Sequence, residues 1–169
     1  MLVEKAGLPP LLAEIIKGSV TWQKIEEIDY EFLGYFLSCH LIIEHYLDEY
    51  LRIIHPKPKW DAVRHTFSQK VALLSDFKIG DKYDCIPAFK HMNSLRNRLS
   101  HDIQFKIGSE DLEPLTNYLT GIYEDKAHIP SEPKAILESF THMSCVLFAS
   151  YISGFADSLK LTVPPKTKK

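Results

Sequence analysis

The chain is short of cysteine, of glycine motifs and of long apolar runs, and each shortage excludes a class of protein. Its three cysteines lie far apart without metal-ligand spacing, so we expect small core residues in a reduced cytosolic protein. Glycine-rich phosphate loops, nucleophile elbows and redox cysteine pairs are missing, which excludes several common enzyme signatures. Alternating strand patterns are absent too, apart from a short stretch at residues 103–107.

No stretch of the sequence predicts a membrane span or a signal peptide. The most apolar stretch, residues 140–156, keeps a helical period and contains one histidine and three serines. It is too short and too polar for a span, so we expect a buried bundle helix. The N-terminus has an acidic residue followed by two prolines, unlike a signal peptide. These features predict a cytoplasmic protein without membrane contact.

The length and charge of the chain suit a single globular domain. A chain of 169 residues can bury a core of its own. A net charge of −2 argues against non-specific coating of nucleic acid, but residues 78–106 contain six basic and three acidic residues. That basic region suits a phosphodiester substrate, although a solvated helix face has the same composition. We expect one domain over residues 1–163 and a disordered basic tail at 164–169.

Apolar residues spaced three and four apart predict an all-α fold. After a short apolar segment at residues 8–16, helices are expected at about residues 25–54, 60–74, 83–100, 109–122 and 133–159. The first should end at His55-Pro56, because the residue before a proline disfavours the helical conformation. Ser109 is expected to cap the fourth. The sequence therefore predicts four to five long helices.

The most informative residues lie at the end of the third predicted helix: Arg96, Asn97 and His101. A histidine titrates near neutrality and can take a proton from a 2′-hydroxyl. An arginine stays charged and binds phosphate with two nitrogens, and an asparagine amide can orient either group. This combination suits RNA cleavage without a metal or a cofactor. Taken singly, Arg96 and His101 would also be explained as cations at a helix C-terminus.

Helical geometry separates these polar residues from the buried side of the same helix. Three apolar side chains fall within roughly 60° of one another and should face the core: Met92, Leu95 and Leu99. Asn97 and His101 lie about 40° apart on the opposite side, and Arg96 lies about 140° from His101. Arg96 therefore cannot share one narrow stripe with His101, but none of the three polar residues needs to be buried. One face of the helix could be shared by two copies of the chain.

The Arg-Asn-x-x-x-His sequence, late on a long helix of an all-helical chain, resembles the signature of the HEPN superfamily. The resemblance implies an up-and-down helical bundle, in other words a HEPN-like fold. Active members are metal-independent endoribonucleases that work as homodimers, many of them as toxins or in anti-phage defence. The resemblance would make Arg96, Asn97 and His101 catalytic, with RNA as the substrate. An antitoxin or regulatory protein is a further candidate partner.

Some features near the motif extend the resemblance and others depart from it. Arg98, Ser100 and Lys90 are candidate substrate-binding residues that could assist with phosphate. In the toxin branch modified by a nucleotidyltransferase partner, a tyrosine follows the histidine by two positions. Here that position is Ile103, so that mode of inhibition is not expected. Helical regulators related to the mannitol operon repressor carry a similar segment, and a non-catalytic regulator or interaction module is the alternative.

Acidic residues and other histidines on the first long helix offer weaker signals. Glu44 and Asp48, one turn apart, either hold Arg96 across the bundle or are solvated acids. His40 and His45 are five residues apart around Glu44. That spacing differs from the His-Glu-x-x-His motif, so a zinc site is not expected.

Overall fold

The computed structural model describes residues 10–23, 28–56, 60–62, 64–74, 83–102 and 105–158. This part of the chain is mostly helical, as the sequence predicts, with a small two-stranded sheet in addition. The elements are β1 Leu11–Ile16, β2 Ser19–Gln23, α1 Tyr30–Ile54, α2 Phe67–Ala72, α3 Ile86–His101, α4 Glu113–Ile122 and α5 Pro133–Ser158. The predicted tail at residues 164–169 lies outside the described residues.

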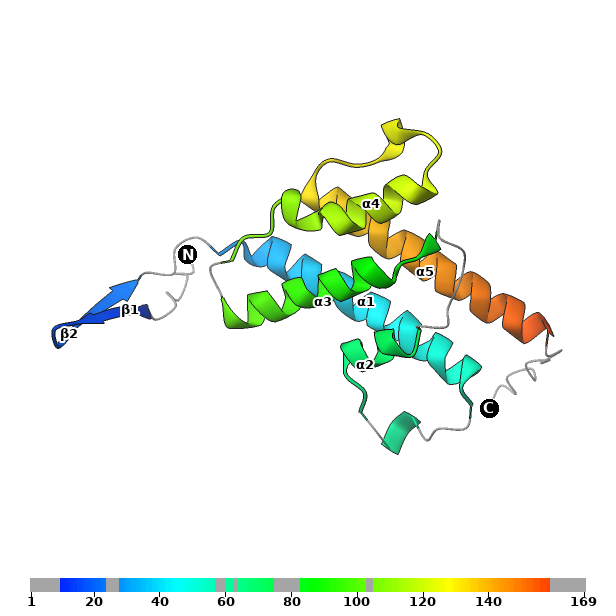
Figure 1. The fold of residues 1–169 in the computed structure, drawn as a ribbon, viewed down its shortest axis with the longest axis horizontal. Coiled ribbons are helices and arrows are strands. Elements are labelled where there is room, and N and C mark those ends of the chain that lie inside the picture. The colour runs from blue at the N-terminus through cyan, green and yellow to red at the C-terminus, as the bar shows by residue number, and fades with distance from the viewer. Residues whose placement is uncertain are drawn as a thin grey trace, which may run out of the picture.

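The two longest helices, α1 and α5, pack along each other and form the centre of the molecule (Figure 1). Helix α3 runs in the opposite direction to α1, and α4 covers α5. After α4 the chain turns back before α5 begins, so that α5 runs in the same general direction as α1 (Figure 1). The helices therefore form a bundle that is not strictly up-and-down.

The core is built from the predicted apolar stripes of these helices. Its largest fully buried side chains include four phenylalanines: Phe36, Phe89, Phe140 and Phe148. The Phe89 ring lies 5.8 Å from both the Phe140 ring and the Phe148 ring, centroid to centroid. These contacts join α3 to α5 and place the three rings in the packed core.

The first helix ends where it is predicted to end but begins at Tyr30 rather than near residue 25, and the second helix is divided. Asp29 caps α1 by accepting a hydrogen bond of 2.9 Å from the Phe32 N–H, and α1 ends at Ile54. The helix expected over residues 60–74 is divided into a short 3-10 turn at Trp60–Ala62 and the six-residue α2. The division has a local cause, since Thr66 and Gln69 form a capping box that starts a new helix at Phe67.

Two smaller expectations around α4 also need correction. Ser109 does not cap a helix with its side chain, because its hydroxyl donates to the Ser131 carbonyl at 3.0 Å. Helix α4 instead begins at Glu113, after a 3-10 turn at Glu110–Leu112. Residues 105–107 form no strand, and residues 103–104 lie outside the described part of the chain.

The sequence predicts no strand near the N-terminus, yet β1 and β2 form an antiparallel hairpin there. The two residues that join them, Lys17 and Gly18, have positive φ angles of 48° and 82°. This backbone twist suits a two-residue hairpin turn. The strand pattern is hidden because β1 contains a bulge between Leu12 and Glu14. The bulge changes the apolar spacing of the strand from two residues to three.

One face of this hairpin is apolar and uncovered. Leu12 pairs with Trp22 and Ile15 pairs with Val20, and the bulge brings both pairs to the same face. These four side chains are 54%, 63%, 66% and 45% exposed, in that order. The hairpin extends away from the helices in Figure 1. Because an isolated two-stranded hairpin is marginally stable in water, this face is suited to a partner surface.

Within the described residues, α5 is the one helix long and apolar enough to cross a membrane. It has 26 residues, a mean hydropathy of 1.3 in its most apolar window, and 33% of that window is buried. The core helix of a soluble protein meets the same criteria. Here α5 packs against α1 and α4 and buries Phe140 and Phe148. Its length and composition are therefore weak evidence for a membrane span.

Candidate functional site

Helix α3 carries the motif on its solvent-facing side. Met92 and Leu95 are buried, whereas Arg96, Asn97 and His101 are all exposed, as the helical geometry predicts. Arg96 and Asn97 interact directly, since Arg96 Nη1 donates to Asn97 Oδ1 at 3.3 Å. The helix ends at His101, so the motif histidine occupies its last position.

Arg96 and Asn97 lie at the edge of an open recess of about 630 Å³ between α1, α2 and α3. The recess is lined by Leu37, His40, Leu41, Glu44, Thr66, Phe67, Ser68, Asn93, Arg96 and Asn97. His101 is not among the lining residues. The structure therefore brings two of the three predicted catalytic residues to the recess and leaves the third outside it, one turn further along the helix.

The three predicted substrate-binding residues lie outside this recess as well. The Arg98 guanidinium carbon lies 3.6 Å from the centre of the Phe105 ring, a cation–π contact. The Ser100 hydroxyl donates to the Arg96 carbonyl at 3.0 Å, within the helix. Lys90 is exposed two turns before Arg98 on α3. Their proposed contacts with RNA remain predictions.

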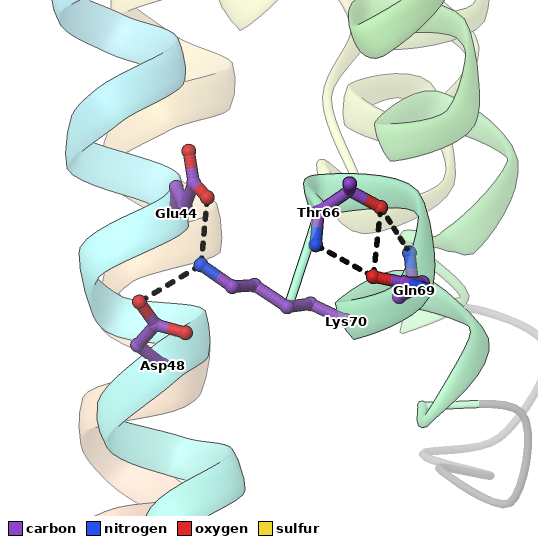
Figure 2. A network of polar contacts seen from close by, with 5 residues as sticks. All are labelled: Glu44, Asp48, Thr66, Gln69 and Lys70. Carbon is purple, nitrogen blue, oxygen red and sulfur yellow. Dashed lines mark hydrogen bonds and ion pairs between the residues drawn. The ribbon is translucent and has the colours of Figure 1, made fainter. Parts of the chain in front are cut away.

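Glu44 and Asp48 bind Lys70 rather than Arg96. Lys70 Nζ lies 2.6 Å from Glu44 Oε1 and 2.9 Å from Asp48 Oδ2, which ties α2 to α1 (Figure 2). Burial alone would lower the pKa of Lys70, but the hydrogen bonds to the two carboxylates outweigh burial and raise it. The lysine is therefore charged, and it compensates much of the negative charge of both acids.

The start of α2 is fixed beside this ion pair by its capping box. The Thr66 N–H donates to Gln69 Oε1 at 2.8 Å, and the Gln69 N–H donates to Thr66 Oγ1 at 3.3 Å (Figure 2). A further contact joins α2 to α3, because Asn93 Nδ2 donates to the Ser68 hydroxyl at 3.0 Å. These bonds hold the α2 side of the recess in place.

His40 is the site residue that sequence reasoning misses. Its side chain lines the recess but is only 4% exposed, and its ring lies 4.4 Å from the Phe67 ring. Among the described residues, its Nε2 has no hydrogen-bond partner. Burial lowers the pKa of His40; nearby Glu44 opposes this effect and Arg96 adds to it.

A sequence signal for His40 does exist. It follows Phe36 by four residues and precedes Glu44 by four, so it lies on the apolar stripe of a helix that also carries an acid. A histidine on such a stripe is more often a core residue than part of a binding site. Only the packing of α3 against α1 shows that His40 lines a recess. The neutral, buried ring in the recess is a consequence of packing between helices.

The described part of the chain offers no cluster of three or more histidine, cysteine or acidic side chains that could hold a metal ion. Cys39 and Cys85 are buried and Cys145 is half-buried, and all three are free thiols. The first two therefore confirm the expected core role, while the third lies at the edge of the core.

The site thus combines an exposed arginine–asparagine pair, an open recess with a neutral histidine, and a terminal histidine outside it. It can bind an anion at Arg96 and a small polar group within the recess. Comparison with protein-family models, with curated proteins and with solved structures finds no match to this chain.

Proposed function

We propose that this protein is a metal-independent endoribonuclease with a HEPN-like fold. One observation carries the proposal: Arg96 and Asn97 are hydrogen-bonded side by side at the edge of an open recess. Within the described residues, Arg96 has no carboxylate partner, because the nearby acids bind Lys70 instead. An exposed, unpaired guanidinium with an amide beside it is suited to phosphate.

The chemistry would be an internal transesterification. His101 takes the proton from a 2′-hydroxyl, whose oxygen attacks the adjacent phosphorus. The bond from phosphorus to the 5′-oxygen breaks, that oxygen takes a proton from water, and His101 returns the proton it took to the solvent. Arg96 neutralises the charge that develops on the phosphoryl oxygens, and Asn97 fixes the geometry of the reacting groups. The products are a 2′,3′-cyclic phosphate and a 5′-hydroxyl.

The active form would be a homodimer. His101 lies outside the recess that Arg96 borders, so a second copy at the same face would bring further arginine and histidine side chains to one groove. The uncovered apolar face of the hairpin supports association, because it leaves large side chains in water. A cytoplasmic toxin or defence role, with an antitoxin or regulatory partner, follows from the family resemblance alone.

The test is cleavage of single-stranded RNA in the presence of a chelator. The enzyme should cut RNA and leave DNA of the same sequence intact, because DNA lacks the attacking 2′-hydroxyl. The 3′ ends should carry a cyclic phosphate. Equal cleavage of DNA, or loss of all activity with the chelator, contradicts the mechanism. A matched control is His142→Ala, which removes another exposed histidine, on α5.

A non-catalytic regulator or interaction module is the second candidate. The observation in its favour is the hairpin, whose apolar face is suited to binding a protein surface. In that case Arg96 and His101 would contribute to a protein–protein contact rather than to catalysis. An absence of cleavage with any RNA, together with formation of a stable complex that needs the hairpin face, would favour it.

A further inference from the structure

We infer that the recess between α1, α2 and α3 is a binding subsite for one unpaired nucleotide, with the base inside and its phosphate at Arg96. The inference rests on the proposed function, since it states which part of an RNA strand the recess receives. The size of the recess suits a ligand as large as a nucleotide. A volume of about 630 Å³ falls within the roughly 300–1,000 Å³ typical of small-molecule sites.

The inner walls of the recess are suited to a flat ring. Leu37 and Leu41 line it from α1, and the rings of His40 on α1 and Phe67 on α2, which also line it, lie 4.4 Å apart. Bases of single-stranded RNA are commonly bound on aromatic and apolar side chains, since every base has an apolar face. A bare phosphate ion would use none of these walls.

Polar groups in the recess suit the edge of a base. Asn93 and Asn97 each present an amide, and beside their bonds to Ser68 and Arg96 these amides can donate and accept further hydrogen bonds. His40 lies beside them with Nε2 unpartnered among the described residues. Burial lowers the pKa of His40, which favours a neutral ring at pH 7. A neutral imidazole is suited to a hydrogen bond with a base rather than to charge pairing with phosphate.

The charge distribution places the phosphate at the rim. Glu44 also lines the recess and would repel an anion, but its carboxylate lies 2.6 Å from Lys70 Nζ. Arg96 is the other charged residue of the lining, and among the described residues its guanidinium hydrogen-bonds to Asn97. The recess therefore combines apolar side chains with one available guanidinium, which matches a base joined to a phosphate.

The experiment is an NMR titration of the whole protein with the four ribonucleoside 3′-monophosphates. Inorganic phosphate and the four nucleosides are titrated for comparison. The monophosphates should bind at least tenfold more tightly than inorganic phosphate. Arg96→Gln should weaken the monophosphates at least tenfold and change nucleoside binding little. Phosphate that binds as tightly as the monophosphates, or no binding at millimolar concentration, overturns the inference.

A matched pair of variants tests the place of binding. Leu41→Trp fills the recess from a side chain that is 64% exposed, so the fold should be retained. It should weaken nucleosides and monophosphates at least tenfold. Ile42→Trp adds the same ring at the next position, which is 46% exposed and does not line the recess, and should change neither. Equal effects of the two variants overturn the inference.

Cleavage assays on the same samples separate this inference from the nuclease proposal. His101→Ala should abolish cleavage and leave monophosphate binding unchanged. Monophosphate binding as predicted, without cleavage of any RNA by the wild type, overturns the nuclease proposal alone and leaves a nucleotide site. If the wild type cleaves RNA, Leu41→Trp leaves that cleavage unchanged and no monophosphate binds, the subsite alone is overturned.

Discussion

Lys70 Nζ lies 2.6 Å from Glu44 Oε1, and this ion pair joins the short α2 to the long α1 beside the recess. Lys70 is unusual for a lysine because it is only 7% exposed. Its side chain also binds Asp48 at 2.9 Å. The pair has two consequences. It fixes α2 against the bundle, and it sets a positive charge against Glu44 on the wall of the recess that Arg96 also lines.

Removing this buried cation should destabilise the fold. In Lys70→Met, Glu44 and Asp48 lose their partner while each remains partly buried, so we expect a loss of about 1–3 kcal/mol in the free energy of unfolding. Urea denaturation followed by circular dichroism measures it. Lys134→Met is the control, because Lys134 pairs with Glu31 at 3.1 Å on the open surface and should lose little. Equal losses in both variants would show that the buried ion pair contributes no more to stability than the exposed one.

The proposed catalytic residues should be separable from the core. His101→Ala and Arg96→Ala should each lower RNA cleavage by roughly 10²-fold or more. Both side chains are exposed, so the free energy of unfolding should change by no more than about 1 kcal/mol. Leu95→Ala, on the buried side of α3, should cost about 2–5 kcal/mol through a core cavity. Activity at the parental rate in His101→Ala contradicts the catalytic role.

Leu95 and Leu99 both lie on the side of α3 that faces the core, but they differ in burial. Leu95 is 4% exposed, whereas Leu99 is only half-buried and packs at the edge of the core. A cavity at Leu99 would therefore be partly open to water, and its cost would be smaller than that of a fully buried leucine.

His40 should make stability depend on pH in a defined direction. Its pKa is lowered in the folded protein from an ordinary value of 6.5, so the unfolded chain takes up the proton first as the pH falls. Stability should therefore be fully present above about pH 6.5 and decrease as the pH falls toward the lowered folded pKa.

The measurement is the melting temperature of the wild type and of His40→Met between about pH 5 and pH 7.5. The wild type should lose more stability than the variant as the pH decreases. His142→Gln, which removes an exposed histidine, should keep the wild-type slope. An identical slope in wild type and His40→Met would show that His40 is not buried in its neutral form.

The hairpin face should control association. Val20→Lys places a charge among the uncovered apolar side chains of the hairpin, and we expect it to weaken the proposed dimer at least tenfold. Light scattering at micromolar concentration measures the change against a chain mass of 19.4 kDa. Ser19→Lys, on the opposite face of β2, should leave the dimer intact. A wild-type protein that is monomeric at this concentration contradicts the shared groove.

The sequence by itself determined the presence of the long helices, the side of each that is buried, and the exposure of the motif. These properties depend on neighbours three and four residues apart, so they can be read from spacing alone. For this reason Met92 and Leu95 are buried while Arg96, Asn97 and His101 are exposed. The same reasoning does not find β1, because a single bulged residue breaks the alternation of apolar and polar side chains by which a strand is recognised.

Only the tertiary structure decided which side chains meet across helices. The pairing of Lys70 with Glu44 spans 26 residues of sequence, and the place of His40 in the recess depends on contacts from α2 and α3. Such contacts arise when helices pack at particular angles and heights, which local periodicity does not encode. The sequence therefore specified the motif residues, while packing gave Arg96 its recess and placed His101 outside it.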